Sequence, residues 1–269
     1  MRDNWPMHFV TRLSAVLLSL WVFAATAAPP DALSDGGHGA VTDVMDGDSF
    51  RMNGVAGDIR MVGIQAPKLP KGRPNFRPWP EAGDAQRALE ALVKNHTITL
   101  RLSDMAKDRN GRTLAHVVRD DGLWLQQELL RKGWARVYTF PDNRQFADEL
   151  YAAEREARAA KRGLWADKYY AVRAPDPDAL KRDLGTFQII EGRVVDAAKI
   201  RGRYYLNFGN DFRTDFTATI APDAVAPFAR AKIDLLALKD KNVRVRGYLR
   251  DFRGPQIELT HPEQIEVLP

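Results

Sequence analysis

Short runs of alternating apolar and polar residues, separated by turn residues, occupy most of the chain. One predicted strand leads into Asn53-Gly54, a strong hairpin signal, and residues 58–64 return with alternating apolar positions. Residues 81–94 and 145–161 instead carry apolar residues at helical spacing. The pattern predicts a mainly β domain with helices over residues 40–166. Its other predicted elements are strands at 97–102, 112–119 and 136–140 and a short helix at 124–131.

The second part of the chain has an almost purely β pattern. Residues 167–185 contain Pro175-Asp176-Pro177 and suggest a linker, after which strands recur through residues 186–269. Five predicted strands with one short helix before the fourth suit a second small, closed β-barrel of the oligonucleotide-binding (OB) type. A β-sandwich is the alternative that the pattern leaves open. The predicted strands are 187–195, 204–208, 216–220, 242–250 and 256–259.

The N-terminus has the pattern of an export signal. Arg2 and Arg12 give it positive charge, an apolar stretch covers residues 13–25, and Ala25-Thr26-Ala27 is a small-residue cleavage signal. The apolar stretch is short for a membrane span, although an uncleaved anchor is the alternative. We expect a signal peptide at residues 1–27, a flexible tail at 28–39 and, after cleavage, a periplasmic or secreted protein without a membrane span.

Composition narrows the choice of chemistry. The chain of 269 residues has a formal net charge of +5, which favours an anionic partner without proving one. It contains no cysteine, so disulfides, thiolate zinc sites and cysteine nucleophiles are excluded. Its five histidines are scattered, with no pair at a metal-ligand spacing.

Acidic and basic residues that suit phosphodiester chemistry occur in the first predicted domain. Asp46-Gly47-Asp48-Ser49 places two carboxylates on one side of an extended strand, and carboxylate oxygens hold hard cations. Arg60 lies on the return strand and Arg112 begins a later one. The planar fork of arginine suits two phosphate oxygens. Each motif alone is weak, because an Asp-Gly turn or a solvated arginine has the same pattern.

In combination, these motifs resemble the staphylococcal-nuclease-like (thermonuclease) family. The Asp-Gly-Asp-Ser turn, Arg60, the run Gly63-Ile64-Gln65-Ala66-Pro67, an Ala-rich helix and the run from Asp108 to Ala115 occur in the family's order. The resemblance spans about residues 40–165. It implies a five-stranded OB-type barrel with helices and calcium-dependent cleavage of nucleic acid.

The resemblance also implies roles for single residues. Asp48 matches the family's first metal-binding aspartate. Arg60 and Arg112 match its two phosphate-binding arginines and are candidate catalytic residues. Tyr138 and Phe140 fall near the aromatic pair against which the substrate base and phosphate lie, and they are candidate nucleic-acid contacts.

Two positions depart from the family pattern. The family's Asp-x-Pro-Glu supplies a second metal carboxylate and a glutamate that acts on water, and the corresponding run here is Gln65-Ala66-Pro67-Lys68. Gln65 offers an amide oxygen and Ala66 a backbone carbonyl, so together with Asp48 we expect a weak site for Ca²⁺ or another divalent metal. Lys68 is protonated at neutral pH and accepts no proton from water. It is instead a candidate to face phosphate.

Three functions fit these residues. The first is an exported protein that binds single-stranded DNA or RNA through its phosphodiesters and cuts it poorly or not at all. The second is an active metal-dependent nuclease with a rearranged base, Asp46 or Glu81. The third is a non-catalytic protein-interaction module of the cell envelope. Interleaved aromatic and basic residues at 201–213 suit single-strand binding, but a barrel core with a solvated face explains them better, and a protein partner for this part is the other alternative.

Overall fold

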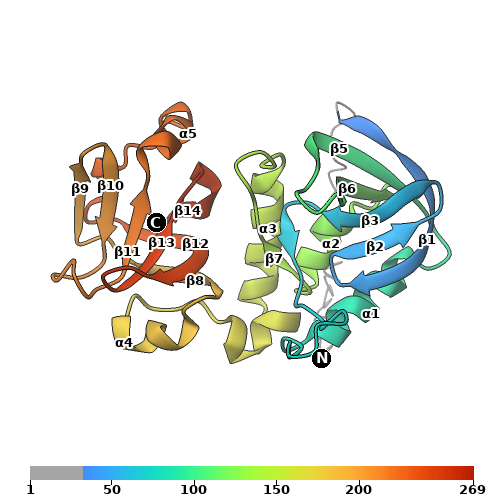
Figure 1. Ribbon diagram of the computed structural model, residues 1–269, viewed down its shortest axis with the longest axis horizontal. Helices are drawn as coiled ribbons and strands as arrows, with labels where there is room; N and C mark the ends of the chain where they lie inside the picture. The colour runs from blue at the N-terminus through green and yellow to red at the C-terminus, as the bar shows by residue number, and fades with distance from the viewer. Residues whose placement is uncertain (1–32) are drawn as a thin grey trace, which may run out of the picture.

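The computed structural model describes residues 33–269, which fold into two parts that lie side by side (Figure 1). The predicted signal peptide and the first residues of the predicted tail, 28–32, lie outside the described residues. Within residues 33–269, no helix is long and apolar enough to cross a membrane.

The first part is a closed barrel of five strands, as the family resemblance implies. Its strands pair in the order β1, β2, β3, β6, β5, and the β3–β6 pair is parallel. The predicted hairpin joins β2 to β3, and Gly54 in its turn has φ 80°, a left-handed angle that suits glycine. The strands are β1 (Ser34–Asp46), β2 (Ser49–Met52), β3 (Val55–Met61), β5 (Thr97–Lys107) and β6 (Thr113–Arg119).

Strand β1 begins inside the segment that the sequence predicts to be a flexible tail. Its first half pairs with β5, so that Ser34 lies opposite Leu102 and His38 opposite Thr99. Glycine suits this strand because the neighbouring strand is close: a Cβ atom on Gly36 would lie 2.8 Å from the Leu102 side chain. The prediction of a tail over residues 34–39 is therefore wrong, since the glycines that suggested a loop allow close strand packing.

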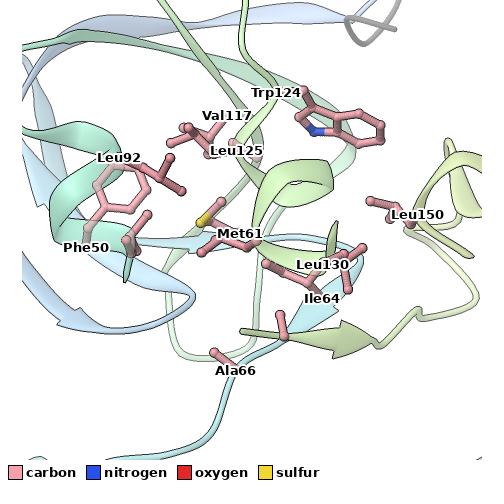
Figure 2. Packing of buried hydrophobic residues seen from close by; sticks show 14 of the residues in the cluster. Phe50, Met61, Ile64, Ala66, Leu92, Val117, Trp124, Leu125, Leu130 and Leu150 are labelled. Carbon is pink, nitrogen blue, oxygen red and sulfur yellow. The ribbon is translucent and has the colours of Figure 1, made fainter. Parts of the chain in front are cut away.

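Three helices cover the barrel and complete its core. Apolar side chains from the strands, such as Phe50 and Met61, pack against Leu92, Leu125 and Leu150 from the helices (Figure 2). A two-stranded pair lies beside the barrel and leads from β3 toward the helices. These elements are α1 (Ala82–Val93), α2 (Leu125–Arg131), α3 (Ala147–Ala159), β4 (Ile64–Gln65) and β7 (Arg136–Val137).

The second part is a mixed sheet that does not close. Its strands β9, β10, β11, β13 and β12 pair in that order, and β8 and β14 also pair with β12. The β11–β13 pair is parallel, like β3–β6 in the first part. Strands β8 and β9 are separated at residues 194–195, where the Val194 N–H donates to the Lys241 carbonyl and the Val195 N–H to the Asn207 carbonyl. Within residues 33–269 no strand ladder closes this sheet, so the predicted closed second barrel is wrong, and its likeness to an OB fold stays a prediction. The strands are β8 (Phe187–Arg193), β9 (Asp196–Ile200), β10 (Arg203–Asn207), β11 (Thr217–Ile220), β12 (Asn242–Asp251), β13 (Pro255–Glu258) and β14 (Ile265–Val267).

The connecting segment and the second part's helices are short. Helix α4 (Pro177–Leu180) lies within the predicted linker, and α5 (Val225–Arg230) precedes β12. Tyr170 and Leu180 of the linker are buried, so the segment packs against its neighbours.

The two parts share a buried contact along helix α3, which lies between the barrel and the second sheet (Figure 1). Arg246 on β12 is 2% exposed and forms ion pairs with Glu154 on α3, at 3.0 Å, and with Glu266, at 2.9 Å. An apolar cluster that includes Trp165 and Phe187 extends the same contact. The second part is therefore joined to the barrel by a buried polar network as well as by apolar packing.

Candidate functional site

The turn between β1 and β2 buries both carboxylates of the Asp-Gly-Asp-Ser motif. Asp46 and Asp48 are 1% and 0% exposed. An Asp46 oxygen accepts hydrogen bonds from the Asp48 backbone N–H, at 3.1 Å, and from the Ser49 hydroxyl, at 2.5 Å. Gly47 has no room for a side chain, because a Cβ atom there would lie 2.7 Å from that of Ala66 and 2.8 Å from that of Ala85. The sequence of the turn thus fixes the two carboxylates against the barrel and α1.

Two lysines from the following loop reach these carboxylates. The Lys68 Nζ atom lies 2.6 Å from both oxygens of Asp48 and 3.4 Å from Asp46 Oδ2. The Lys71 Nζ atom lies 2.6 Å from Asp46 Oδ2 and donates to the Ser49 hydroxyl at 2.8 Å. The Lys68 and Lys71 side chains are 21% and 31% exposed, so both ammonium groups form the solvent-facing cover of the buried carboxylates.

Arg60 closes the other side of Asp48. Its Nη1 lies 2.7 Å from Asp48 Oδ1, and its Nη2 donates to the Ile64 carbonyl at 2.7 Å. Longer hydrogen bonds, both 3.2 Å, reach the carbonyls of Asp48 and Met61. With its side chain only 10% exposed, Arg60 ties strands β2, β3 and β4 together. Asp46, Asp48, Arg60, Lys68 and Lys71 are called the Asp–Lys cluster below.

The cluster contains three cations and two carboxylates, a net charge of +1. Burial alone would raise the pKa of Asp46, but Lys68 and Lys71 hold that pKa far below its usual range. Burial raises the pKa of Asp48 and lowers that of Lys68, while the attraction between the two groups opposes both shifts. Asp46 is therefore a poor proton acceptor, and the cluster as a whole attracts anions.

Comparison with known proteins identifies the family of this chain. The family model described as "Staphylococcal nuclease homologue" matches residues 58–167. An "Uncharacterized endonuclease" of Escherichia coli is 33% identical over 132 residues, which cover 48% of this chain and 78% of that protein. The chain belongs to the staphylococcal nuclease family. A "Thermonuclease" of Staphylococcus hyicus is 28% identical over 134 residues (47% of this chain, 75% of that protein), and "Endonuclease YncB" of Bacillus subtilis is 31% identical over 132 residues (48% and 61%).

Members of the staphylococcal nuclease family are generally calcium-dependent, but the residues of this member do not fit the ion. Calcium needs six to eight oxygen ligands at about 2.3–2.6 Å. The Lys68 ammonium lies 2.6 Å from both Asp48 oxygens, where a cation bound by Asp48 would have to lie. Among residues 33–269, no group of three or more acidic, histidine or cysteine side chains is arranged to hold a metal.

Gln65, another predicted metal ligand, is engaged elsewhere, and Ala66 contacts Asp48 through its backbone N–H, while the predicted ligand was its carbonyl. The Gln65 side-chain oxygen accepts two hydrogen bonds from Arg136, at 2.7 and 3.0 Å. The Ala66 backbone contributes its N–H, which donates to Asp48 Oδ2 at 2.6 Å. The expected site for Ca²⁺ or another divalent metal at Asp48, Gln65 and Ala66 is thus filled by protein donors in this nuclease-family chain.

The remaining charged candidates lie around the cluster. Arg112 precedes β6, which pairs with β3 so that Leu114 lies opposite Arg60. Its guanidinium binds Asp108 at 2.7 Å and stays 32% exposed, which leaves part of it open to a ligand. Glu81, the second candidate base, precedes α1 and interacts with Asp84 rather than with the Asp–Lys cluster.

The predicted aromatic pair lies beside the second part of the chain. The rings of Tyr138 and Phe140 are 4.9 Å apart, and Tyr138 also packs on Phe187 at 5.0 Å. The Tyr138 backbone N–H donates to the Gly63 carbonyl at 2.9 Å, next to the strand that Arg60 holds. The predicted aromatic pair therefore contacts Phe187, a residue outside the family match.

Sequence reasoning missed Lys71 and Arg136. Lys71 lies in the basic loop Lys68-Leu69-Pro70-Lys71, so its charge was visible, but no spacing rule connects it to Asp46. Arg136 lies 71 positions from Gln65 in sequence, and no local signal pairs them.

Proposed function

We propose that this protein binds single-stranded nucleic acid through its phosphodiesters without a metal ion and cuts it poorly or not at all. The relatives named thermonuclease and endonuclease support nucleic acid as the ligand. Binding without a metal ion is supported by the position of the Lys68 ammonium group, which lies 2.6 Å from both Asp48 oxygens. It supplies the positive charge that a metal ion would otherwise bring to a phosphate.

The charges around the cluster support anion binding. Lys68, Lys71 and Arg112 are each partly exposed, and the Asp–Lys cluster carries a net charge of +1. Lysine acts as a flexible point charge toward phosphate, and arginine adds a planar fork. Arg60 supports the site by holding Asp48 in place, since its donors already bind Asp48 and backbone carbonyls.

The same residues argue against rapid hydrolysis. A general base must accept a proton from water near neutral pH. Asp46 is held ionised by two lysines and has a strongly lowered pKa, which makes it a weak base. Lys68 occupies the position of the family's glutamate and donates hydrogen bonds to Asp48. The active-nuclease alternative therefore has no base that this geometry favours.

Fluorescence anisotropy with labelled single-stranded DNA and RNA of about 12 nucleotides tests the binding. We expect equal affinity in EDTA and in calcium, and a smaller salt dependence in the double variant Lys68→Gln, Lys71→Gln. Each lost phosphate contact should lower the slope of log K against log salt by about 0.7. The double variant Lys94→Gln, Lys161→Gln, which changes two exposed lysines outside the cluster, is the control.

Cleavage is followed on gels with calcium, magnesium and manganese. We expect no product in the time that a metal-dependent nuclease needs to degrade the probe. Rapid cleavage that disappears in Asp48→Ala would contradict the proposal. Absence of binding at low salt would favour the protein-interaction alternative.

We also propose export to the periplasm or the medium, supported by the N-terminal pattern. Fractionation of cells that express the full chain tests it, and a full-length protein found only in the cytoplasm would contradict it.

A further inference from the structure

A pocket of about 290 Å³ opens between the two parts of the chain. Its lining from the first part includes Tyr138 and Phe140, and its lining from the second part includes Tyr248, Arg250 and His261. The family match ends at residue 167, so most of the residues that line this pocket lie outside it. It is called the interdomain pocket below.

Two of its aromatic rings are unusually open to solvent. Phe140 is 49% and Tyr248 is 45% exposed, whereas Phe187 between them is buried. Tyr138 packs edge-on against Tyr248, with ring centroids 6.4 Å apart, and Phe187 packs against Tyr248 at 5.9 Å. The buried rings hold the exposed ones in place, so Phe140 and Tyr248 present fixed aromatic surfaces on which a flat ligand can stack.

The buried ionisable lining consists of a neutral histidine and of Arg246, whose charge is paired with Glu154 and Glu266, whereas the exposed lining includes a cation. The His261 ring interacts with the hydroxyls of Thr139, at 2.7 Å, and Thr260, at 2.9 Å. Burial, with help from Arg144, lowers the pKa of His261 to about 4, so the ring is neutral at pH 7. The Arg250 side chain is 71% exposed and lies 3.8 Å from Glu258.

The charge of Glu258 is shared between two arginines. Arg203 binds Glu258 at 2.9 Å, which is closer than Arg250. Arg250 is therefore free to meet another anion. Exposed aromatic rings with an exposed arginine beside them match a nucleobase followed by a phosphate, because bases stack on rings and phosphates pair with arginine.

The pocket is connected to the Asp–Lys cluster through one strand pair. Strand β4 pairs with β7 so that Ile64 lies opposite Val137, the residue before Tyr138. Arg60 holds the Ile64 carbonyl from the other side at 2.7 Å. The β4–β7 pair therefore links the backbone beside the cluster to the backbone beside the interdomain pocket.

We propose that Tyr248 and Arg250 of the second part extend the predicted aromatic position at Tyr138 and Phe140, with Tyr248 stacking on one base of a single-stranded nucleic acid and Arg250 on an adjacent phosphate. The proposal rests on the proposed function and deepens it, because it makes the second part of the chain a contributor to substrate binding.

Anisotropy with the double variant Tyr248→Ala, Arg250→Ala tests this. Both side chains are well exposed, so thermal unfolding should stay close to that of the wild type. Stacking of one base contributes about 1–3 kcal/mol, so we expect affinity for single-stranded DNA to fall roughly 5- to 100-fold. The matched control is Phe252→Ala, Arg253→Ala, an exposed aromatic residue and arginine in the same hairpin that do not line the pocket. We expect this control to bind like the wild type.

A second probe, an abasic deoxyribose-phosphate oligomer, separates stacking from charge. The single variant Tyr248→Ala should lose affinity for DNA but not for the abasic oligomer. Equal losses for both probes would overturn base stacking at Tyr248. Wild-type affinity for DNA in the Tyr248→Ala, Arg250→Ala variant, alongside weakened binding in Lys68→Gln, Lys71→Gln, would overturn this inference and leave the proposed function standing. Absence of binding by the wild type would overturn both.

Discussion

Replacing Lys68 by glutamate is expected to turn the Asp–Lys cluster from an anion-binding site into a calcium-binding one. The wild-type cluster has three cations against two carboxylates, and Lys68→Glu changes its net charge from +1 to −1. The variant also places a third carboxylate beside Asp46 and Asp48. Two unit charges about 4 Å apart interact by roughly 4 kcal/mol at an effective dielectric near 20. The reversal is therefore large enough to change which ion the cluster prefers.

Thermal unfolding with and without calcium measures this change. Weak calcium sites have dissociation constants of about 10⁻⁴ to 10⁻³ M, so about 10 mM calcium stabilises the variant by up to about 2.7 kcal/mol. For a chain of this size, that raises Tm by roughly 5–10 °C. We expect no rise in the wild type or in Lys94→Glu, which changes an exposed lysine of the same domain. A calcium-dependent rise in the wild-type Tm would refute the reasoning, because calcium would then bind with Lys68 in place.

Two further predictions concern buried groups. Arg246→Met leaves the fully buried Glu154 without its main partner, so the free energy of unfolding measured in urea should fall by about 3–5 kcal/mol. Adding Glu154→Gln should recover part of that loss. If the effects of the two substitutions simply add, the pairing is contradicted. Burial lowers the pKa values of His116 and His261 to about 4, so only the unfolded chain takes up these protons between pH 6.5 and 4. As the pH falls across this window, the free energy of unfolding should fall by about 3 kcal/mol per histidine. His261→Asn should remove the contribution of one histidine to this pH dependence.

The first barrel is predictable from sequence because its signals are local. The Asn53-Gly54 turn, the alternation in residues 58–64 and the apolar spacing of residues 81–94 each specify one element without reference to distant residues. The start of β1 is not predictable in the same way. Its glycines at 36, 37 and 39 have the composition of a loop. Contacts distant in sequence explain two of them, because Cβ atoms on Gly36 and Gly39 would meet Leu102 and the Asn53 carbonyl, and Gly37 has φ 98°.

The second sheet was harder to predict from sequence, again because contacts distant in the chain determine part of it. The five predicted strands and the helix before β12 occur in the predicted order, but the pattern missed β9 and β14. Closure, however, depends on whether the chain stays in the sheet between β8 and β9, and that depends on contacts distant in sequence. Residues 194–195 have the same apolar character as the strands on either side of them, and nothing in the pattern marks the break.

The site could be located but not fully assembled from the sequence. Asp46, Asp48, Arg60 and Lys68 were identified from their order along the chain, and the structure brings them together. The orientation of Lys68 was beyond such reasoning. A lysine beside a phosphate site and a lysine that binds the aspartates have the same sequence, and only the distance of 2.6 Å to Asp48 distinguishes them.

The two departures from the family pattern follow from the charges around them. Asp48 is fully buried, and a buried carboxylate without a cation is destabilising by several kcal/mol. Arg60 and Lys68 together supply the cations that Asp48 needs, at 2.7 and 2.6 Å. At position 65, burial lowers the pKa of Arg136 only to about 10, so that side chain stays charged at neutral pH and needs acceptors. It finds them in the Gln65 oxygen and in the Phe187 carbonyl, at 3.1 Å, on the first strand of the second part. Gln65 thus contributes to the junction between the two parts, where the family's aspartate would have faced a metal.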